Sequence, residues 1–145
     1  MTYAPRTYQV NPIAKAVQWM RKNTLGCVLD LSMSSGKATI AAFVAHEIKE
    51  ISGGKKVLVL CPNATLVKQN AETYAKISDD YSIYSASISK SLRHLVVFAT
   101  PQSFINVVEK TNGEFCAVII DECDQTTETV KSIVDTLRAK NPMLR

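Results

Sequence analysis

Short apolar runs alternate with helical patterns along the chain, and this alternation restricts the possible folds more than any other feature. The apolar runs span residues 27–31, 57–61, 94–100 and 115–120, with a weaker run at 81–88. Runs of this length that stay apolar at successive positions are typical of strands buried on both faces. Together with intervening helices, they predict a mainly parallel sheet covered on both sides, a three-layer α/β/α domain.

Five helical patterns separate or flank these runs. Asn11 is placed to cap the first helix, with Pro12 at its first helical position, and Pro101 opens the fourth. Right-handed crossovers between parallel strands gather the loops that follow each strand along one edge of the sheet, where we expect the chemistry. The predicted helices span residues 12–23, 39–50, 64–77, 102–110 and 126–140.

The composition fits one compact domain, because 46% of the 145 residues are hydrophobic and 21% are charged. The net charge of +4 suits a polyanionic partner but is common in other proteins too. No apolar run is long enough to span a membrane and no secretion signal opens the chain, so we expect an intracellular protein of the cytoplasm, nucleoid or nucleus. We expect reduced, buried thiols at Cys27, Cys61, Cys116 and Cys123.

The loop SMSSGKA follows the first apolar run and carries Gly36 and Lys37. A phosphate site needs converging backbone N–H groups, a helix N-terminus and a lysine that reaches the β and γ phosphates. The loop departs twice from G-x-x-x-x-G-K-[ST], since Leu31 stands at the first glycine position and Ala38 at the hydroxyl position. By itself, the loop fits a Walker A site and a serine-rich turn with a solvated lysine equally well.

Asp121 and Glu122 directly follow the apolar run at residues 115–120. In ATPases, one carboxylate at such a strand exit serves the Mg²⁺ shell and a second acts on the attacking water, as in a Walker B motif. Acidic residues at this place also commonly cap helices. Coming after the lysine loop in the order that a nucleotide site requires, the pair favours nucleotide binding over a domain for another small molecule.

Five segments resemble motifs Q, I, Ia, Ib and II of superfamily-two helicases of the DEAD/DEAH-box type. They are RTYQ, SSGKA, VLVLCPNATLVKQ, VVFATPQSF and VIIDECD, in the family's order and spacing over nearly the whole chain. The opening R-x-Y-Q and the final NPMLR resemble RadD-like proteins, in which N-P-x-L-R precedes the strand of the S/T-A-T motif. The resemblance implies that residues 1–145 form a single RecA-like P-loop domain, a fragment that ends before that strand. It also implies a second RecA-like domain in cis.

This resemblance implies the N-terminal motor domain of an ATP-dependent DNA or RNA helicase or translocase, with ATP and Mg²⁺ as cofactors. Lys37 would bind the β and γ phosphates, Asp121 would hold Mg²⁺, and Glu122 would be the catalytic base. Asp124 would link the nucleotide state to the second domain. Adenine would be recognised by Arg6 and Gln9. The implied nucleotide-binding residues are Arg6, Gln9, Ser34, Ser35, Gly36, Lys37 and Ala38.

Motifs Ia and Ib of the resemblance imply contacts with a nucleic-acid backbone, which position a strand without reading its sequence. A proline that starts a helix after each strand is the alternative explanation of these segments. Trp19 and Phe104 are expected in the core, and His46 and His94 have no partners at metal-ligand spacing. The implied nucleic-acid-binding residues are Pro62, Asn63, Gln69, Thr100, Pro101 and Gln102.

Ala38 leaves a second function open. It lacks the hydroxyl that binds Mg²⁺ in the P-loop, and Thr39 points about 100° away from that position on a helix. Ser34 stands where the family has a glycine. A RecA-like module that binds nucleic acid or protein and is deficient in hydrolysis is therefore the alternative to a motor domain.

Overall fold

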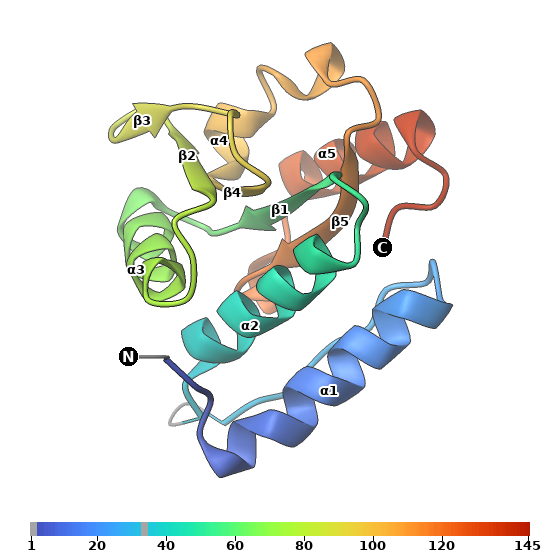
Figure 1. The fold of residues 1–145 in the computed structure, drawn as a ribbon. Coiled ribbons are helices and arrows are strands. Elements are labelled where there is room, and N and C mark those ends of the chain that lie inside the picture. Colours follow the sequence, from blue (N-terminus) through green and yellow to red (C-terminus); the bar gives the residue numbers. More distant parts are fainter. Residues whose placement is uncertain (1–2, 33–34) are drawn as a thin grey trace.

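The computed structural model of the protein describes residues 3–32 and 35–145 and contains a five-stranded, mainly parallel sheet (Figure 1). The strand order is β3-β2-β4-β1-β5. β2, β4, β1 and β5 run parallel to their neighbours, and the short β3 pairs antiparallel with β2. The strands are β1 (Lys56–Leu60), β2 (Tyr81–Ser85), β3 (Ser89–Lys90), β4 (Val96–Ala99) and β5 (Phe115–Ile120).

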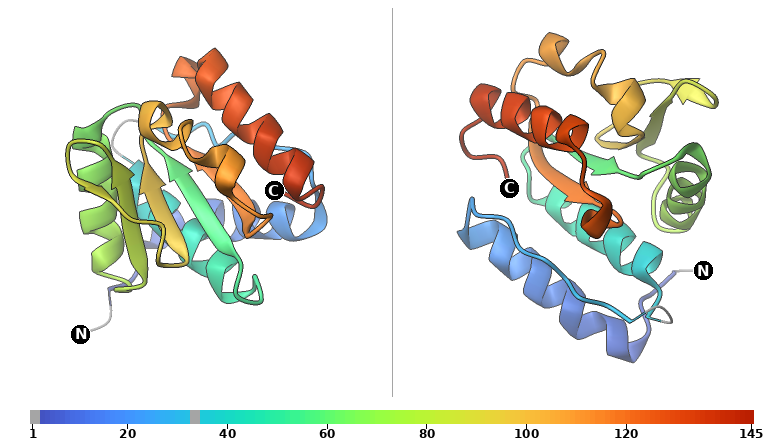
Figure 2. Two further views of the ribbon diagram at one scale, coloured as in Figure 1. Left: turned by 90° about the horizontal axis from the view of Figure 1, so that it is seen from above. Right: turned by 180° about the vertical axis from the view of Figure 1, so that it is seen from behind.

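Helices cover both faces of the sheet, which confirms the predicted α/β/α class (Figure 2). One layer contains α2 and α3, with α1 packed on the outer side of α2, and the other contains α4 and α5. Two short 3₁₀ helices precede and follow β5. The helices are α1 (Thr7–Lys22), α2 (Lys37–Glu50), α3 (Ala64–Ala75), α4 (Pro101–Phe104), η1 (Val108–Lys110), η2 (Cys123–Gln125) and α5 (Glu128–Lys140).

The core is divided by the sheet according to the alternation of side chains along each strand. In β1, Val57 and Val59 pack on the side of α2 and α3, whereas Leu58 and Leu60 pack on the side of α5. All four are fully buried. Successive apolar residues in this strand therefore serve two cores, as expected for a central strand of a parallel sheet.

The predicted strand at residues 27–31 is wrong. The structure assigns no strand there, and the Val28 side chain is 74% exposed. A strand needs a neighbouring strand for its backbone hydrogen bonds, but this segment pairs with none of the described strands. The outer edge of β5 is met instead by Arg145, which accepts from the Val118 amide at 2.7 Å and donates to the Cys116 carbonyl at 2.9 Å.

The first helix begins at Thr7, earlier than predicted, and Pro12 lies inside it. The Gln9 side chain accepts a hydrogen bond from the Arg6 amide at 2.9 Å, which caps the helix more than one turn before Pro12. The fourth predicted helix is also corrected, because α4 ends at Phe104 and the chain turns before η1. The local sequence patterns therefore predicted that these helices exist but not the residues at which they begin and end.

Two expectations about the core are also corrected. Cys61 is buried, whereas Cys27 and Cys123 are exposed, although all four thiols are free as predicted. Phe104 is buried as expected, but the Trp19 side chain is 41% exposed and its Nε1 donates to the Leu25 carbonyl at 2.8 Å. Within the described ranges, no helix has both the length and the apolar character needed to cross a membrane.

Candidate functional site

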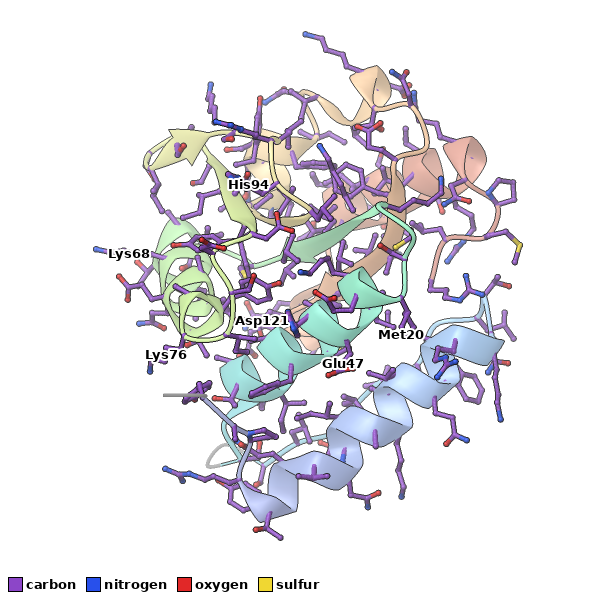
Figure 3. The ribbon with its side chains drawn as sticks, in the orientation of Figure 1. Met20, Glu47, Lys68, Lys76, His94 and Asp121 are labelled. Atoms are coloured by element: carbon purple, nitrogen blue, oxygen red, sulfur yellow. The ribbon has the colours of Figure 1, made fainter. Side chains whose placement is uncertain are left out.

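Asp121 and Glu122 lie at the carboxyl end of β5, where the sequence places the acidic pair. The Asp121 amide donates to the Leu60 carbonyl at 2.9 Å, so the pairing of β5 with β1 continues to the first residue of the pair. Figure 3 shows Asp121 between α2 and α3. The register of the sheet therefore fixes the position of the Asp121 backbone.

A groove of about 780 Å³ brings Lys37 together with the acidic residues. Lys37 is the first residue of α2, and Asp121, Glu122 and Asp124 follow β5. The groove also has apolar walls, formed by α1, by the segment at residues 25–31 and by β5. A helix N-terminus, a lysine and these three carboxylates thus line one groove, a combination suited to a phosphate with a bound cation.

Gly36 and Gln9 connect the loop before α2 to the first helix. Gly36 caps α2 in the left-handed conformation, with φ of 73°. Gln9 is 3% exposed, and its Nε2 donates to the Ser35 carbonyl at 2.9 Å. A Cβ on Gly36 would lie 2.5 Å from this nitrogen. The backbone conformation therefore favours glycine here, and any Cβ would push the Gln9 amide away from Ser35.

The two residues expected to recognise adenine differ in their surroundings. Both polar atoms of the buried Gln9 side chain are bound to the protein backbone, at Arg6 and Ser35. Arg6 is exposed, and its Nη1 donates to the Tyr8 hydroxyl at 3.3 Å. In this arrangement Gln9 links α1 to the loop, and the adenine contact stays a prediction.

The hydroxyl groups beside Ala38 are held by protein partners. Ser35 Oγ donates to the Ser32 carbonyl at 2.7 Å, and Thr39 Oγ1 lies 3.2 Å from the Tyr3 hydroxyl. Ser34 lies outside the described residues. In this arrangement the Thr39 hydroxyl is engaged with Tyr3, on the N-terminal segment.

Two buried side chains, Asn70 and Cys61, interact with the Asp121 carboxylate, one by a hydrogen bond and one through its charge. Asn70 on α3 donates from Nδ2 to Asp121 Oδ2 at 3.2 Å. Burial, reinforced by the negative charge of Asp121, raises the pKa of the Cys61 thiol to about 12. Cys61 therefore stays a neutral thiol. Sequence reasoning did not identify Asn70 as a site residue, although an amide on the apolar face of α3 was a usable signal.

Glu122 has an uncommon backbone conformation. Its φ of 54° and ψ of 53° lie in the left-handed region, and among the described residues it is the one non-glycine with positive φ. Such a conformation costs about 1–3 kcal/mol and tends to occur at functional sites. The turn at Glu122 ends β5 and directs the chain into η2.

The residues expected to bind nucleic acid lie at the same edge of the sheet. A small pocket of about 40 Å³ is lined by Pro62, Pro101, Gln102 and both acidic residues. Asn63 caps α3, since its Oδ1 accepts from the Leu66 amide at 3.0 Å. The exposed side chains are Asn63, Gln69 and Gln102, the half-buried one is Pro62, and the buried ones are Thr100 and Pro101.

Solved structures share this fold. The UvsW helicase from bacteriophage T4 matches with a TM-score of 0.75 and 23% identity, over 98% of this chain and 51% of that chain. The Sulfolobus solfataricus SWI2/SNF2 ATPase core, solved with dsDNA, matches with a TM-score of 0.72 and 17% identity, over 94% and 30%. The type ISP restriction-modification enzyme LlaGI, solved with a DNA substrate mimic, matches with a TM-score of 0.68 and 18% identity, over 90% and 16%.

These matches confirm a RecA-like fold, and the chain spans about half the length of the UvsW chain that it matches. A search of curated proteins finds no significant match. The model of the family described as type III restriction enzyme, res subunit (ResIII), matches residues 2–144. The chain therefore belongs to the ResIII family and is an N-terminal domain of the superfamily-two helicase type, as the sequence motifs predict.

Proposed function

We propose that this chain is the ATP-binding motor domain of a nucleic-acid helicase or translocase. The observation that carries the proposal is the groove that Lys37, Asp121 and Glu122 line together. Lys37 starts α2, whereas the acidic pair follows β5, so residues far apart in the sequence meet at one groove. The second RecA-like domain needed for directed movement would lie elsewhere in a longer chain.

Each side chain of the groove has a role that follows from its charge and position. The Lys37 ammonium and the first amides of α2 would hold the β and γ phosphates. Asp121, with its backbone bound to Leu60, would orient the cation that accompanies the phosphates. Glu122 would accept a proton from the attacking water. These roles make Lys37, Asp121 and Glu122 the proposed Walker A and Walker B residues.

The donor set fits a magnesium ion bound together with a nucleotide. No group of three or more His, Cys, Asp or Glu side chains that could hold a metal occurs in the described part of the chain. Mg²⁺ at nucleotide sites takes most ligands from phosphates and water and needs only one or two carboxylates, a role that Asp121 would fill. When bound, it would neutralise charge on the transferred phosphoryl group.

The loops after β1 and β4 would form the nucleic-acid contact. Asn63, Gln69 and Gln102 are exposed there, while the buried Thr100 and Pro101 could contribute only through their backbone and the start of α4. DNA-bound structures of the SWI2/SNF2 core and LlaGI support this proposal through their shared fold. The contacts would hold the phosphate backbone and leave base sequence unread.

We also propose that residues 1–145 form one domain and that the second RecA-like domain follows in cis. UvsW supports this proposal, because the match covers 51% of that chain. Arg145 donates to the Cys116 carbonyl and accepts from the Val118 amide, which is the hydrogen-bond pattern of parallel strands. A strand before the second domain would therefore run parallel to β5.

A module that binds nucleic acid or protein without efficient hydrolysis is the second candidate. Ala38 supplies no hydroxyl, and the hydroxyls of Ser35 and Thr39 are bound to Ser32 and Tyr3. This observation weakens the magnesium shell but leaves Lys37 and the acidic pair in place. The two candidates therefore differ in hydrolysis and agree in nucleotide binding.

Calorimetry with Mg-ATP tests the proposal on the wild-type chain, on Lys37→Ala and on the control Lys110→Ala. Lys110 is an exposed lysine of η1, so its substitution removes the same charge outside the groove. We expect Lys37→Ala to weaken ATP binding about 10- to 100-fold, because a charge-assisted contact is lost. Lys110→Ala should bind like the wild type.

Absence of ATP binding by a folded wild-type chain would contradict the proposal. Nucleic-acid-stimulated hydrolysis by a longer chain with a second RecA-like domain would support the motor. Binding without such hydrolysis would support the module instead.

A further inference from the structure

We infer that Asn70 is a positioning residue for the Asp121 carboxylate and thereby controls the magnesium dependence of nucleotide binding. This inference rests on the proposed function. Asn70 Nδ2 lies 3.2 Å from Asp121 Oδ2 and 2.8 Å from the Leu66 carbonyl. The residue belongs to α3, whereas its partner carboxylate follows β5. The contact thus joins the helix after β1 to the acidic pair.

The chemistry of the two contacts fixes the orientation of the Asn70 amide. Both partners, a carboxylate and a backbone carbonyl, only accept hydrogen bonds. The side-chain nitrogen has two hydrogens, one for each acceptor, whereas the side-chain oxygen has none. The donor facing Asp121 is therefore the amide nitrogen, with no alternative flip that satisfies both partners.

The burial of Asn70 indicates that its contact with Asp121 matters more than its bond within α3. Asn70 is 4% exposed and lies on the buried face of α3 with Val67, Ala71 and Tyr74. An amide in such a place carries a desolvation cost that an aliphatic residue of similar size would avoid. The bond to Leu66 is one that exposed asparagines also form, as Asn106 does with the Gln102 carbonyl at 3.1 Å. The bond to Asp121 distinguishes Asn70.

The bond restricts rotation of the carboxylate. The Asp121 backbone is already held by Leu60, so the side-chain torsions are its remaining freedom. With Oδ2 bound to Asn70, the other oxygen is left to orient the water shell of a cation. Loss of the Asn70 amide would therefore weaken the metal-dependent part of ATP binding, while phosphate contacts made by Lys37 would persist.

The test compares ATP binding by the wild type, Asn70→Leu and Asn70→Ala over a magnesium titration and in excess chelator. We expect both variants to need about tenfold more Mg²⁺ for half of the full enhancement of ATP binding, with chelator-condition affinity unchanged. Asn106→Leu is the matched control. It removes a bond of the same kind, from an asparagine amide to the backbone carbonyl four residues earlier, but no contact with a carboxylate. Thermal unfolding identifies any variant that fails to fold. If Asn70→Leu does not fold, the comparison rests on Asn70→Ala.

The outcomes distinguish the role of Asn70 from nucleotide binding by the domain. Magnesium-dependent ATP binding by the wild type with an identical magnesium requirement in the folded Asn70 variants would overturn the role of Asn70 alone. An equal loss of affinity with and without magnesium would also overturn it, since that is the signature of a general structural defect. A folded wild type that binds no ATP would overturn the inference together with the proposed function.

Discussion

The acidic pair and Lys37 line one groove, but the two parts of the chain are supported in different ways. Asp121 follows a strand that is paired with β1 and packed between two helical layers, and its side chain is bound to Asn70. Gly36 and Lys37 follow a segment without strand pairing, in which Val28 is exposed. The loop is tied to the remainder of the domain mainly through α2 and the Gln9 contact with Ser35.

This difference shows that one half of the candidate site is fixed by the sheet while the other half depends on a few local contacts. Perturbations of β5 should therefore act on the whole domain. Changes in the loop should act on ligand binding more than on folding, and changes in the segment at residues 27–31 should have the smallest effect on the isolated domain.

The largest effect is expected for Phe115→Ala at the start of β5. Phe115 is 1% exposed, and its ring lies edge-on to Phe104 with centroids 5.6 Å apart. Removal of a buried phenyl ring should lower the free energy of unfolding by about 3–5 kcal/mol, measured by urea denaturation. A loss below about 1 kcal/mol would mean that β5 is not the rigid side of the site.

A smaller effect is expected for Gly36→Ala in the lysine loop. The left-handed conformation disfavours alanine by about 1–2 kcal/mol, and the added Cβ would displace the Gln9 amide from Ser35. We expect this loss in urea denaturation, together with weaker Mg-ATP binding in calorimetry. Gly26→Ala is the control, since its Cβ would meet no atom within 4 Å. Equal free energies of unfolding and equal Mg-ATP affinities of the two variants would contradict the importance of the Gly36 conformation.

The smallest effect is expected for Val28→Ala. With this side chain 74% exposed, the free energy of unfolding of the isolated domain should change by no more than about 0.5 kcal/mol. In a longer chain that adds a strand along β5, the same substitution should cost more, about 1 kcal/mol, because the side chain becomes covered. Equal small losses in both chains would argue against the proposed strand.

The fold was largely predictable from the sequence because the strongest apolar runs form most of the sheet. β1 and β4 are central strands, and their uninterrupted apolar pattern reflects burial on both faces, whereas β5 lies at the edge of the described sheet and is half-buried from Val118 to Ile120. Residues 27–31 have the same apolar pattern but pair with no strand in the structure. Whether a segment finds a strand to pair with cannot be read from its own sequence. The start of α1 was missed because the Gln9 side chain, and not Asn11, provides the cap.

The site was predictable where it depends on chain order and unpredictable where it depends on packing. The motif order predicts Lys37 and Asp121 at one edge of the sheet, and the structure brings both to one groove although no strand precedes Lys37. Asn70, which binds Asp121, and Gln9, which binds Ser35 two residues before Lys37, come from other helices. Their contacts depend on how α3 and α1 pack, which no spacing along the chain specifies.

The outer edge of β5 pairs only with Arg145 among the residues that the structure describes. Backbone groups left open along an apolar strand are a template on which another strand can add. At high concentration, we therefore expect self-association of the isolated domain to begin at this edge. A second molecule bound there would cover part of the groove beside the acidic pair. Self-association of the domain and access of a ligand to the groove would therefore depend on the same backbone groups of β5.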